Sequence, residues 1–303
     1  MFSLEAGCDF WATIPRSRIQ EHKNPRKSGA AGFWRPWVFE VLSSRRRQRR
    51  CQISRWILVW ATYSIRIRLR RTAMKTIGFI GSGLIGATVA RLAIDAGYNV
   101  VMSNSREPRT LLPLTQALGP NARAATAEEA AQAGDIVVVT IPLNSLHEIP
   151  TEPLRRKVVI ETSNYYEQRD GFIEQLDSRE ITTSQILQDR VPEAKVVKAF
   201  NNINFRHLGE LARPEHADAR TSLVIAGGDD SAKAEVREFL NAIGYGTIDA
   251  GPLAQGWRFD NGQPAYGRPY IPQGAQPTSI FDMGPGHLAT EQEIKDALDA
   301  ASR

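Results

Sequence analysis

The feature that most constrains the fold is a glycine-rich turn between an apolar run and an amphipathic segment. Residues 75–80 are short and rich in isoleucine, as in a buried strand, and residues 85–96 follow a helical period that Gly97 ends. The turn between them consists of Gly81, Ser82, Gly83, Leu84, Ile85 and Gly86. In such a βαβ unit the first glycine permits a tight turn, the second admits a pyrophosphate, and the third lets the helix pack closely on the strand. The pattern predicts a dinucleotide-binding unit. A glycine-rich turn in an unrelated α/β protein is the alternative.

The residues after the second expected strand, 98–102, indicate which dinucleotide is bound. Enzymes that use NAD place an acidic residue about 20 positions beyond the glycine turn, where it binds the ribose 2′-hydroxyl. The residues at this place are Ser103, Asn104, Ser105 and Arg106. No carboxylate is present to repel a 2′-phosphate, and the Arg106 guanidinium can form a charge-assisted hydrogen bond with one. The sequence therefore favours NADP over NAD, unless Arg106 is simply a solvated residue at the start of a helix.

The remainder of the chain up to residue 250 alternates strand and helix patterns. The strands are expected at 135–141, 157–161, 194–200, 221–226 and 246–249, and the helices at 126–133, 182–188 and 231–243. The expected helix at 182–188 begins with a capping box of Thr182 and Gln185. This alternation predicts an α/β fold with a doubly wound, mostly parallel Rossmann sheet, forming an NADP-binding domain over 74–250.

Residues 251–303 differ because glycine and proline recur throughout, before a final helix that Thr290 and Glu293 would cap. We expect residues 251–272 to act as a lid over the nicotinamide end of the cleft. A planar slot for the substrate would be formed by Trp257, Phe259, Tyr266 and Tyr270. Arg258 and Arg268 would then meet an acidic group on a small-molecule acceptor. The alternative is that Trp257 and Arg258 only pack the tail on the core.

Residues 1–73 form a basic extension of different composition. They hold 16 basic and 4 acidic residues, whereas 22 basic and 29 acidic residues remain in 74–303. Both cysteines and five of the six tryptophans also lie in the extension. We expect it to be disordered or not part of the native protein, with translation starting at Met74. A transit peptide, or a basic arm for nucleic acid or acidic lipid, is the alternative. The acidic body argues against nucleic-acid binding there.

Several motifs in order resemble the deazaflavin (coenzyme F420)-dependent NADP oxidoreductase family, and also the related cytoplasmic reductase domain of membrane metalloreductases. The resemblance covers about residues 74–256. Besides the glycine turn, it rests on Ser105-Arg106, Val139-Thr-Ile-Pro142, Val196-Val-Lys-Ala-Phe-Asn-Asn202, Gly227-Gly-Asp-Asp230 and Asp249-Ala-Gly-Pro-Leu253. The tail departs from the family pattern after residue 256, which leaves the acceptor open.

The resemblance implies hydride transfer between NADPH and a bound planar acceptor, with a deazaflavin or flavin as co-substrate. It places the 2′-phosphate at Ser82, Ser105 and Arg106. It also places the nicotinamide near two turns at the carboxyl ends of strands, made of Thr140, Ile141 and Pro142 and of Phe200, Asn201 and Asn202. The cofactor carries such chemistry and the protein supplies position. A deazaflavin acceptor needs no general acid, whereas a carbonyl or an imine acceptor does.

No catalytic residue can be assigned from the sequence. Asn201, Asn202 and His147 are candidates, although His147 is also typical of a surface helix, and His207 with Arg206 is expected on a loop surface. A non-enzymatic NADP(H)-binding module, and an imine or carbonyl reductase related to pyrroline-5-carboxylate reductase, remain alternatives. The short tail disfavours the latter, since those enzymes carry a helical dimerisation domain. We expect a cytoplasmic protein without a metal site or membrane span, and leave a homodimer open.

Overall fold

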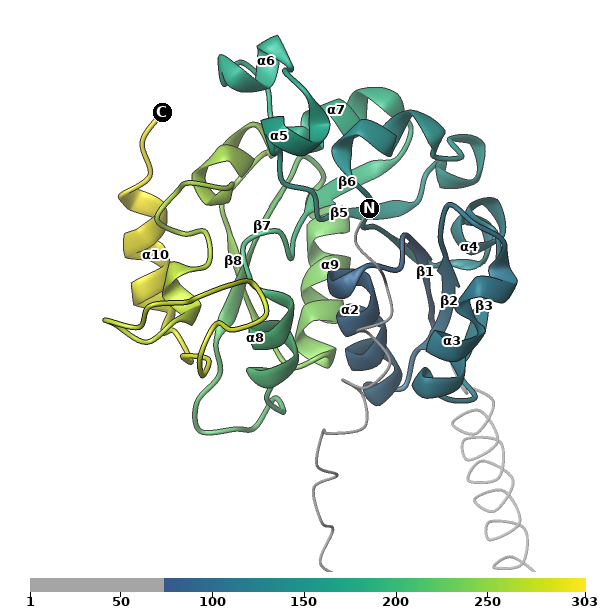
Figure 1. The fold of residues 1–303 in the computed structure, drawn as a ribbon, viewed down its shortest axis with the longest axis horizontal. Helices are drawn as coiled ribbons and strands as arrows, with labels where there is room; N and C mark the ends of the chain where they lie inside the picture. The colour runs from purple at the N-terminus through teal and green to yellow at the C-terminus, as the bar shows by residue number, and fades with distance from the viewer. Residues whose placement is uncertain (1–73) are drawn as a thin grey trace, which may run out of the picture. The chain divides into compact units, whose positions relative to one another are not determined.

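The computed structural model describes residues 74–303, and the basic extension predicted for 1–73 lies outside the described residues. The described chain forms an eight-stranded sheet in the order β3-β2-β1-β4-β5-β6-β7-β8 (Figure 1). Its strands are β1 (Thr76–Ile80), β2 (Asn99–Ser103), β3 (Ala122–Ala124), β4 (Ile136–Val139), β5 (Val158–Glu161), β6 (Lys195–Lys198), β7 (Ser222–Gly227) and β8 (Gly246–Asp249). The first six strands are parallel and follow the strand order of a dinucleotide-binding sheet.

The sheet reverses direction once, between β6 and β7. These two strands are antiparallel, with Val197 opposite Gly227 and Lys198 opposite Ala226, whereas β8 is parallel to β7. The prediction of a doubly wound, mostly parallel Rossmann sheet is therefore confirmed. Because β7 runs the other way, its amino-terminal end lies at the same edge of the sheet as the carboxyl ends of β1 to β6.

Both faces of the sheet are buried, which explains the continuous apolar strands. Along β4, Ile136 and Val138 belong to one apolar cluster and Val137 and Val139 to another. The helices are α2 (Leu84–Asp95), α3 (Leu112–Leu118), α4 (Ala127–Ala133), α5 (Glu167–Asp170), α6 (Glu174–Asp177), α7 (Thr183–Arg190), α8 (Phe205–Glu210), α9 (Asp230–Ala242) and α10 (Glu291–Asp299). The first cluster includes residues of α2, α3, α8, α9 and α10, and the second includes residues of α4, α6 and α7. Helices therefore cover both faces.

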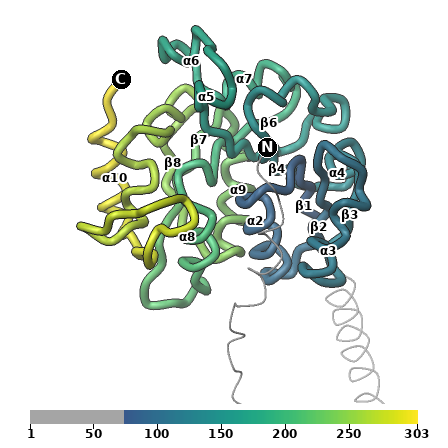
Figure 2. Tube along the Cα trace, viewed as in Figure 1, coloured from purple at the N-terminus to yellow at the C-terminus, as the bar shows by residue number. Residues whose placement is uncertain are grey.

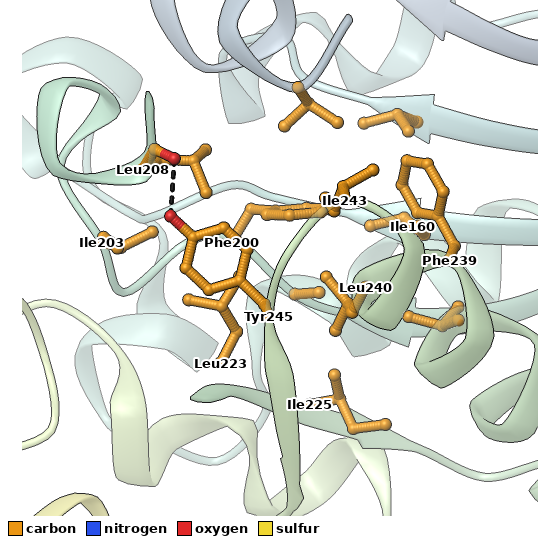
Figure 3. Close-up of a cluster of buried hydrophobic side chains, with 14 of the residues drawn as sticks. Ile160, Phe200, Ile203, Leu208, Leu223, Ile225, Phe239, Leu240, Ile243 and Tyr245 are labelled. Atoms are coloured by element: carbon orange, nitrogen blue, oxygen red, sulfur yellow. Dashed lines mark hydrogen bonds between the residues drawn. The ribbon is translucent and has the colours of Figure 1, made fainter. Parts of the chain in front are cut away.

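The first cluster is densest where β6, β7 and α9 meet (Figure 3). The Phe200 and Phe239 rings pack edge to face with centroids 6.4 Å apart. The buried Tyr245 hydroxyl donates a hydrogen bond of 2.6 Å to the Leu208 carbonyl, drawn as a dashed line in Figure 3. A buried phenol is tolerated here because its polar end has a partner.

The C-terminal segment returns along the sheet to the edge at which β6 ends. The chain leaves β8 and pairs with β7, since the Gly227 amide donates to the Gly251 carbonyl at 2.9 Å. It then forms the 3-10 helix η6 (Leu253–Phe259), which packs on β6, β7 and α7. Later residues of the same segment contact α8, seen beside the yellow C-terminal chain in Figure 2, through the hydrogen bond from Asn204 Nδ2 to the Ile280 carbonyl.

Five short α-helices and strands were not expected from the sequence: α3, β3, α5, α6 and α8. The surface position expected for His207 is wrong, because His207 lies on α8 with 1% of its surface exposed. Its Nε2 lies 3.2 Å from the Gly284 carbonyl, so the returning tail covers it. Within residues 74–303, no helix is both long and apolar enough to cross a membrane.

Candidate functional site

Two of the three glycines in the turn are required by the packing of the protein itself. Gly81 has a φ of +109°, and a Cβ there would lie 2.3 Å from the Thr140 carbonyl oxygen. A Cβ on Gly86 would lie 2.7 Å from Thr140 Cγ2. Both contacts are too close for a real side chain. The turn, the start of α2 and the end of β4 are therefore held together at the carboxyl edge of the sheet.

The middle glycine is different. Gly83 has a φ of −69°, which any residue can adopt, and a Cβ there would meet no atom within 4 Å. Nothing in the described protein requires a glycine at this position, so the open side is suited to a close-lying ligand. Helix α2 also begins without a side-chain cap and without an acidic residue in its first turn. Its free amide groups and positive dipole end form an anion site that fits a pyrophosphate.

The four polar residues after β2 divide into two pairs. The Ser103 hydroxyl is buried and donates to the Phe79 carbonyl at 2.7 Å, so its hydrogen is already engaged. Asn104 accepts from the Arg106 amide and shapes the turn. Ser105 and Arg106 are exposed, and their side chains form no hydrogen bond or ion pair with other residues of 74–303. The pair Ser105 and Arg106 is thus the part of this turn that can receive a 2′-phosphate, and the assignment stays a prediction.

The turn after β4 continues the same edge. Thr140 and Ile141 are half-buried and Pro142 is exposed, before the 3-10 helix η4 (Leu143–Glu148). The Ser163 hydroxyl, just beyond β5, donates to the Ile141 carbonyl at 3.4 Å. On η4, the His147 side chain is 72% exposed, as expected for a surface histidine. Its role at the nicotinamide remains a prediction.

The turn after β6 fastens the tail to the sheet. Phe200 has a φ of +64°, and its ring is fully buried in the core. Asn201 Nδ2 donates to the Phe259 carbonyl at 3.0 Å, and Asn202 Nδ2 donates to the Ala265 carbonyl at 3.1 Å. The buried Oδ1 atoms of both asparagines have no partner among the described residues. The two amides therefore hold the tail in place, while binding of a cofactor by residues 200–202 stays a prediction.

A buried charged cluster lies where the tail meets the sheet, and the sequence reasoning missed it. The Lys198 and Glu161 side chains are fully buried, and Lys198 Nζ lies 3.2 Å from Glu161 Oε2. Lys198 Nζ also lies 3.0 Å from Oδ1 of Asp260, whose side chain is 25% exposed. The signal available in the sequence was a lysine and a glutamate that end apolar strands. Asp260, by contrast, comes from the tail.

The hydrogen bonds around the cluster involve every carboxylate oxygen of Glu161 and Asp260 except one. Lys198 Nζ donates to the Ser163 carbonyl at 3.1 Å and to Thr183 Oγ1 at 2.9 Å. Glu161 accepts from the Ser163 amide and, at 2.5 Å, from the Ser184 hydroxyl. Asp260 Oδ1 accepts from Lys198 and Asn201, whereas Asp260 Oδ2 has no hydrogen-bond partner within 74–303.

Burial and neighbouring charges shift the pKa values of Asp260 and Lys198. Burial raises the pKa of the Asp260 carboxyl, and the nearby Lys198 only partly opposes it. Burial alone would lower the pKa of Lys198, but Asp260 and Glu161 outweigh it and raise that pKa. The lysine therefore stays charged, and Asp260 gains a proton more readily than an exposed aspartate.

A pocket of about 340 Å³ opens beside the cluster. Its lining includes Tyr165, Tyr166, Asp177, Thr183, Trp257 and Asp260. A smaller pocket of about 140 Å³, lined by residues such as Thr151 and Arg190, lies instead at the loops that precede β5 and β6. The larger pocket is at the carboxyl edge, where open α/β sheets bind their ligands.

The tail residues expected to form a planar slot take different positions. Trp257 lines the pocket, with the Arg303 guanidinium 5.1 Å from its ring centroid. Phe259 and Tyr270 are fully buried in the core, so the expectation that they line a slot is wrong. Tyr266 bonds Tyr166 through their hydroxyls at 2.7 Å. The 3-10 helices η6 and η7 (Arg268–Tyr270) direct the Phe259 and Tyr270 rings inward, where burial of apolar surface stabilises the fold.

Arg258 is engaged with the last helix. Its Nη2 lies 2.9 Å from the Leu298 carbonyl and 2.8 Å from Asp299 Oδ1. Arg268 is exposed and is not among the residues that line the pocket. A substrate role for Trp257 and Arg258 stays a prediction, with Trp257 the better placed of the two.

Comparison with known proteins tests the family prediction. Residues 76–165 match the family described as NADP oxidoreductase, coenzyme F420-dependent. The predicted resemblance is confirmed. The stretch that matches this family contains the glycine turn, the turn after β2 with Ser105 and Arg106, and the end of β5, all at the edge described above.

Relatives of known structure or name support the same class. A hypothetical protein of Sinorhizobium meliloti is 29% identical with a TM-score of 0.56, over 64% of this chain and 94% of that one. A structure described as a candidate F420-dependent NADP reductase, from Arthrobacter sp. FB24, is 27% identical with a TM-score of 0.50, over 61% of this chain and 87% of its own.

The metalloreductase STEAP3 of Rattus norvegicus is 29% identical over 181 residues, which is 59% of this chain. The chain spans about a third of that curated relative, since the match covers 34% of its length. With the family match, these similarities confirm the predicted resemblance to NADP-dependent oxidoreductases. They leave its acceptor open. The described residues contain no group of three or more metal-ligating side chains.

Proposed function

We propose that residues 74–303 bind NADPH along the carboxyl edge of the sheet and transfer its hydride to a planar small-molecule acceptor, a deazaflavin or flavin-like coenzyme. The observation that carries the proposal is the contrast within the glycine turn. Gly81 and Gly86 are needed by the protein, while Gly83 is needed only if something lies against it. NADPH supplies the reducing hydride, and this chain supplies position.

The contacts to the cofactor follow the edge. The amides at the start of α2 bind the pyrophosphate, and Ser105 and Arg106 bind the 2′-phosphate, with Ser82 nearby in the turn. Thr140 to Pro142 support the nicotinamide. The ring then points toward the Ser163 and Asn201 side of the edge, where the 340 Å³ pocket holds the acceptor. Electron transfer onward to a metal, the activity in the name of the rat relative, is left out of the proposal.

The pocket walls explain how water would be excluded. Tyr165, Tyr166 and Trp257 supply flat apolar surface, and the Tyr166–Tyr266 hydroxyl pair joins the wall after β5 to the tail. A ring system that fits between these walls replaces water on both of its faces.

We also propose a cytoplasmic location, and sedimentation of the purified protein would decide between a monomer and a homodimer.

Calorimetric titration with NADPH and NADH, followed by turnover with F420 and with FMN, tests the proposal. We expect NADPH binding and reduction of at least one of these acceptors. Trp257→Ala should keep the NADPH Kd within about twofold and lower kcat/KM for the acceptor by about tenfold, the loss of one stacking contact. NADPH binding without turnover of any acceptor would instead favour a cofactor-binding module. Loss of cofactor binding in Trp257→Ala would place the pocket wrongly.

A further inference from the structure

We propose that Asp260 donates a proton to the acceptor as the hydride arrives, with Lys198 and Glu161 as its positioning residues. The inference rests on the proposed function and deepens it. It predicts that, besides the deazaflavin or flavin-like coenzyme proposed above, the pocket takes ring acceptors with a polar C=N or C=O bond, whose nitrogen or oxygen must be protonated on reduction. Such acceptors differ from a deazaflavin, which needs no general acid.

The net negative charge of the cluster favours the uptake of one proton. Two carboxylates and one ammonium group lie together, with Lys198 and Glu161 fully buried, so the fully ionised cluster carries one uncompensated negative charge. Uptake of a single proton neutralises it, and burial favours the neutral form. The proton resides on Asp260, because the oxygens of Glu161 are already occupied by Ser163, Ser184 and Lys198.

Asp260 is also the one member of the cluster that reaches the pocket. Its side chain is 25% exposed, whereas those of Lys198 and Glu161 are fully buried. Asp260 Oδ2 lacks a partner among the described residues, so its proton can be directed at a bound acceptor. Lys198 Nζ, 3.0 Å from Oδ1, stabilises the carboxylate that remains after transfer.

Ser163 links the cluster to the turn expected at the nicotinamide. Its hydroxyl donates to the Ile141 carbonyl, and its own carbonyl accepts from Lys198 Nζ. One residue therefore contacts both the β4 turn and the charged cluster. An acceptor in the pocket would contact the proton source, and concerted reduction requires that the nicotinamide reach the same acceptor from the β4 turn.

The reaction balances without any further reagent. In an imine or an isolated carbonyl the carbon receives the hydride pair from NADPH, and the π pair of the C=N or C=O bond moves onto the nitrogen or oxygen. In a quinone the hydride adds to one ring oxygen, and the π electrons move through the ring onto the other oxygen. That atom forms its new bond to the proton as the Asp260 O–H bond breaks. The products are NADP⁺, the reduced acceptor and the Asp260 carboxylate, which takes a new proton from solvent in the pocket.

The charges of the pocket select among acceptors. Glu167, Asp177 and Asp260 line it against the single cation Arg179, while Arg258 is held by Asp299. Carboxylates outnumber cations in the lining, so the ring that enters the pocket should be neutral or cationic. This reverses the expectation from the sequence that Arg258 and Arg268 would meet an acidic group on the acceptor.

The test compares Asp260→Asn with wild type on three probes: F420, the cyclic imine 3,4-dihydroisoquinoline, and the quinone menadione. The amide keeps an acceptor for Lys198 but has no transferable acid proton. We expect kcat/KM for the imine or the quinone to fall about a hundredfold. NADPH affinity and F420 reduction should stay within about threefold. Asp260→Glu should recover part of the loss, and Asp230→Asn, a carboxylate 98% exposed on α9, should change none of these quantities.

The pH dependence gives a second readout. For wild type, kcat/KM with the imine or quinone should fall as pH rises through the pKa of Asp260, and Asp260→Asn should lack this fall. The titratable groups that interact with Asp260 are Lys198 on β6, Glu161 on β5 and Tyr266 in the tail. The other titratable or charged groups lining the pocket are Tyr165, Tyr166, Glu167, Asp177 and Arg179. Burial raises the pKa of Tyr266, so it is not charged in this range.

Specific outcomes would overturn the inference. Equal losses on all three probes would make Asp260 a structural residue, and unchanged kinetics would remove it from the reaction. A wild-type enzyme that reduces F420 but neither the imine nor the quinone would overturn this inference while upholding the proposed function. Failure to bind NADPH would overturn both.

Discussion

The two halves of the site are built by different means. The cofactor half, around Gly81 to Gly86, is made of backbone: a tight turn, a glycine with open space beside it, and the free amides of α2. The acceptor half is made of side chains from distant parts of the chain, with Glu161 on β5, Lys198 on β6 and Asp260 on the tail. The residues of a backbone site are consecutive in the sequence, whereas the residues of a side-chain site come together only when the whole chain folds.

The sharpest test of the backbone half is the matched pair Gly81→Ala and Gly83→Ala. Alanine at 81 must adopt a φ of +109° and place its Cβ 2.3 Å from the Thr140 carbonyl oxygen. We expect a loss of more than about 4 kcal/mol in the free energy of unfolding, or no folded protein.

Alanine at 83 meets no protein atom within 4 Å, so the free energy of unfolding should change by less than about 0.5 kcal/mol. NADPH should nevertheless bind at least tenfold more weakly, or about 1.4 kcal/mol. Urea unfolding and calorimetric titration measure the two effects. If Gly83→Ala binds NADPH as tightly as wild type, the pyrophosphate does not lie against this residue.

The acceptor half depends on side chains, so the loss of a single side chain should destabilise it. Lys198→Met leaves the Glu161 and Asp260 carboxylates buried without their cation, which should cost about 3–5 kcal/mol of unfolding free energy. Lys195→Met is the control on the same strand. Lys195 is 40% exposed and pairs with Asp229 at the surface, so its loss should barely change stability. Equal effects of the two variants would contradict a buried cluster.

The pH dependence of stability sharpens the same contrast. Because the folded-state pKa of Asp260 is raised, its contribution is fully present below the unfolded pKa and is lost as pH rises through the folded value. The difference between wild type and Asp260→Asn in urea unfolding should therefore change with pH in that direction. A difference that stays constant with pH would show that Asp260 does not titrate within the fold.

The last test concerns cofactor choice. Arg106→Ala should weaken NADPH binding by about 1.5–3 kcal/mol, the loss of a charged hydrogen bond, and barely change NADH binding. Arg109→Ala is the control, since Arg109 is equally exposed but already pairs with Glu107. Titration with both cofactors measures the difference. Equal losses for NADPH and NADH would mean that Arg106 does not contact the 2′-phosphate.

The sequence predicted the elements that carry a strong local pattern. The strand at 246–249 and the capping boxes of Thr182 and Thr290 are as expected, and α9 differs from its prediction by one residue at each end. Strand β3 was missed because its three residues Ala122 to Ala124 lack β-branched side chains and lie at the edge of the sheet. Local patterns say little about such short elements.

The candidate site was predictable to the same extent. The glycine turn and Arg106 follow from spacing alone. The Glu161–Lys198 pair joins residues 37 apart, and Asp260 enters only because the tail returns along β6. His207 was misplaced for the same reason, since the tail that buries it is distant in sequence. What decides these positions is tertiary packing, which no local period encodes.

The contacts that the C-terminal tail makes with the end of β6 have a consequence for biosynthesis. A chain emerges from the ribosome amino-terminal end first. The glycine turn, β1 and β4 are complete early, so the cofactor edge can form while the rest is being made. Asn201 and Asn202 must wait for Phe259 and Ala265, and Lys198 must wait for Asp260. We therefore expect the nascent chain to form the cofactor-binding edge first. The acceptor pocket should form only after residues 259–265 have left the ribosome.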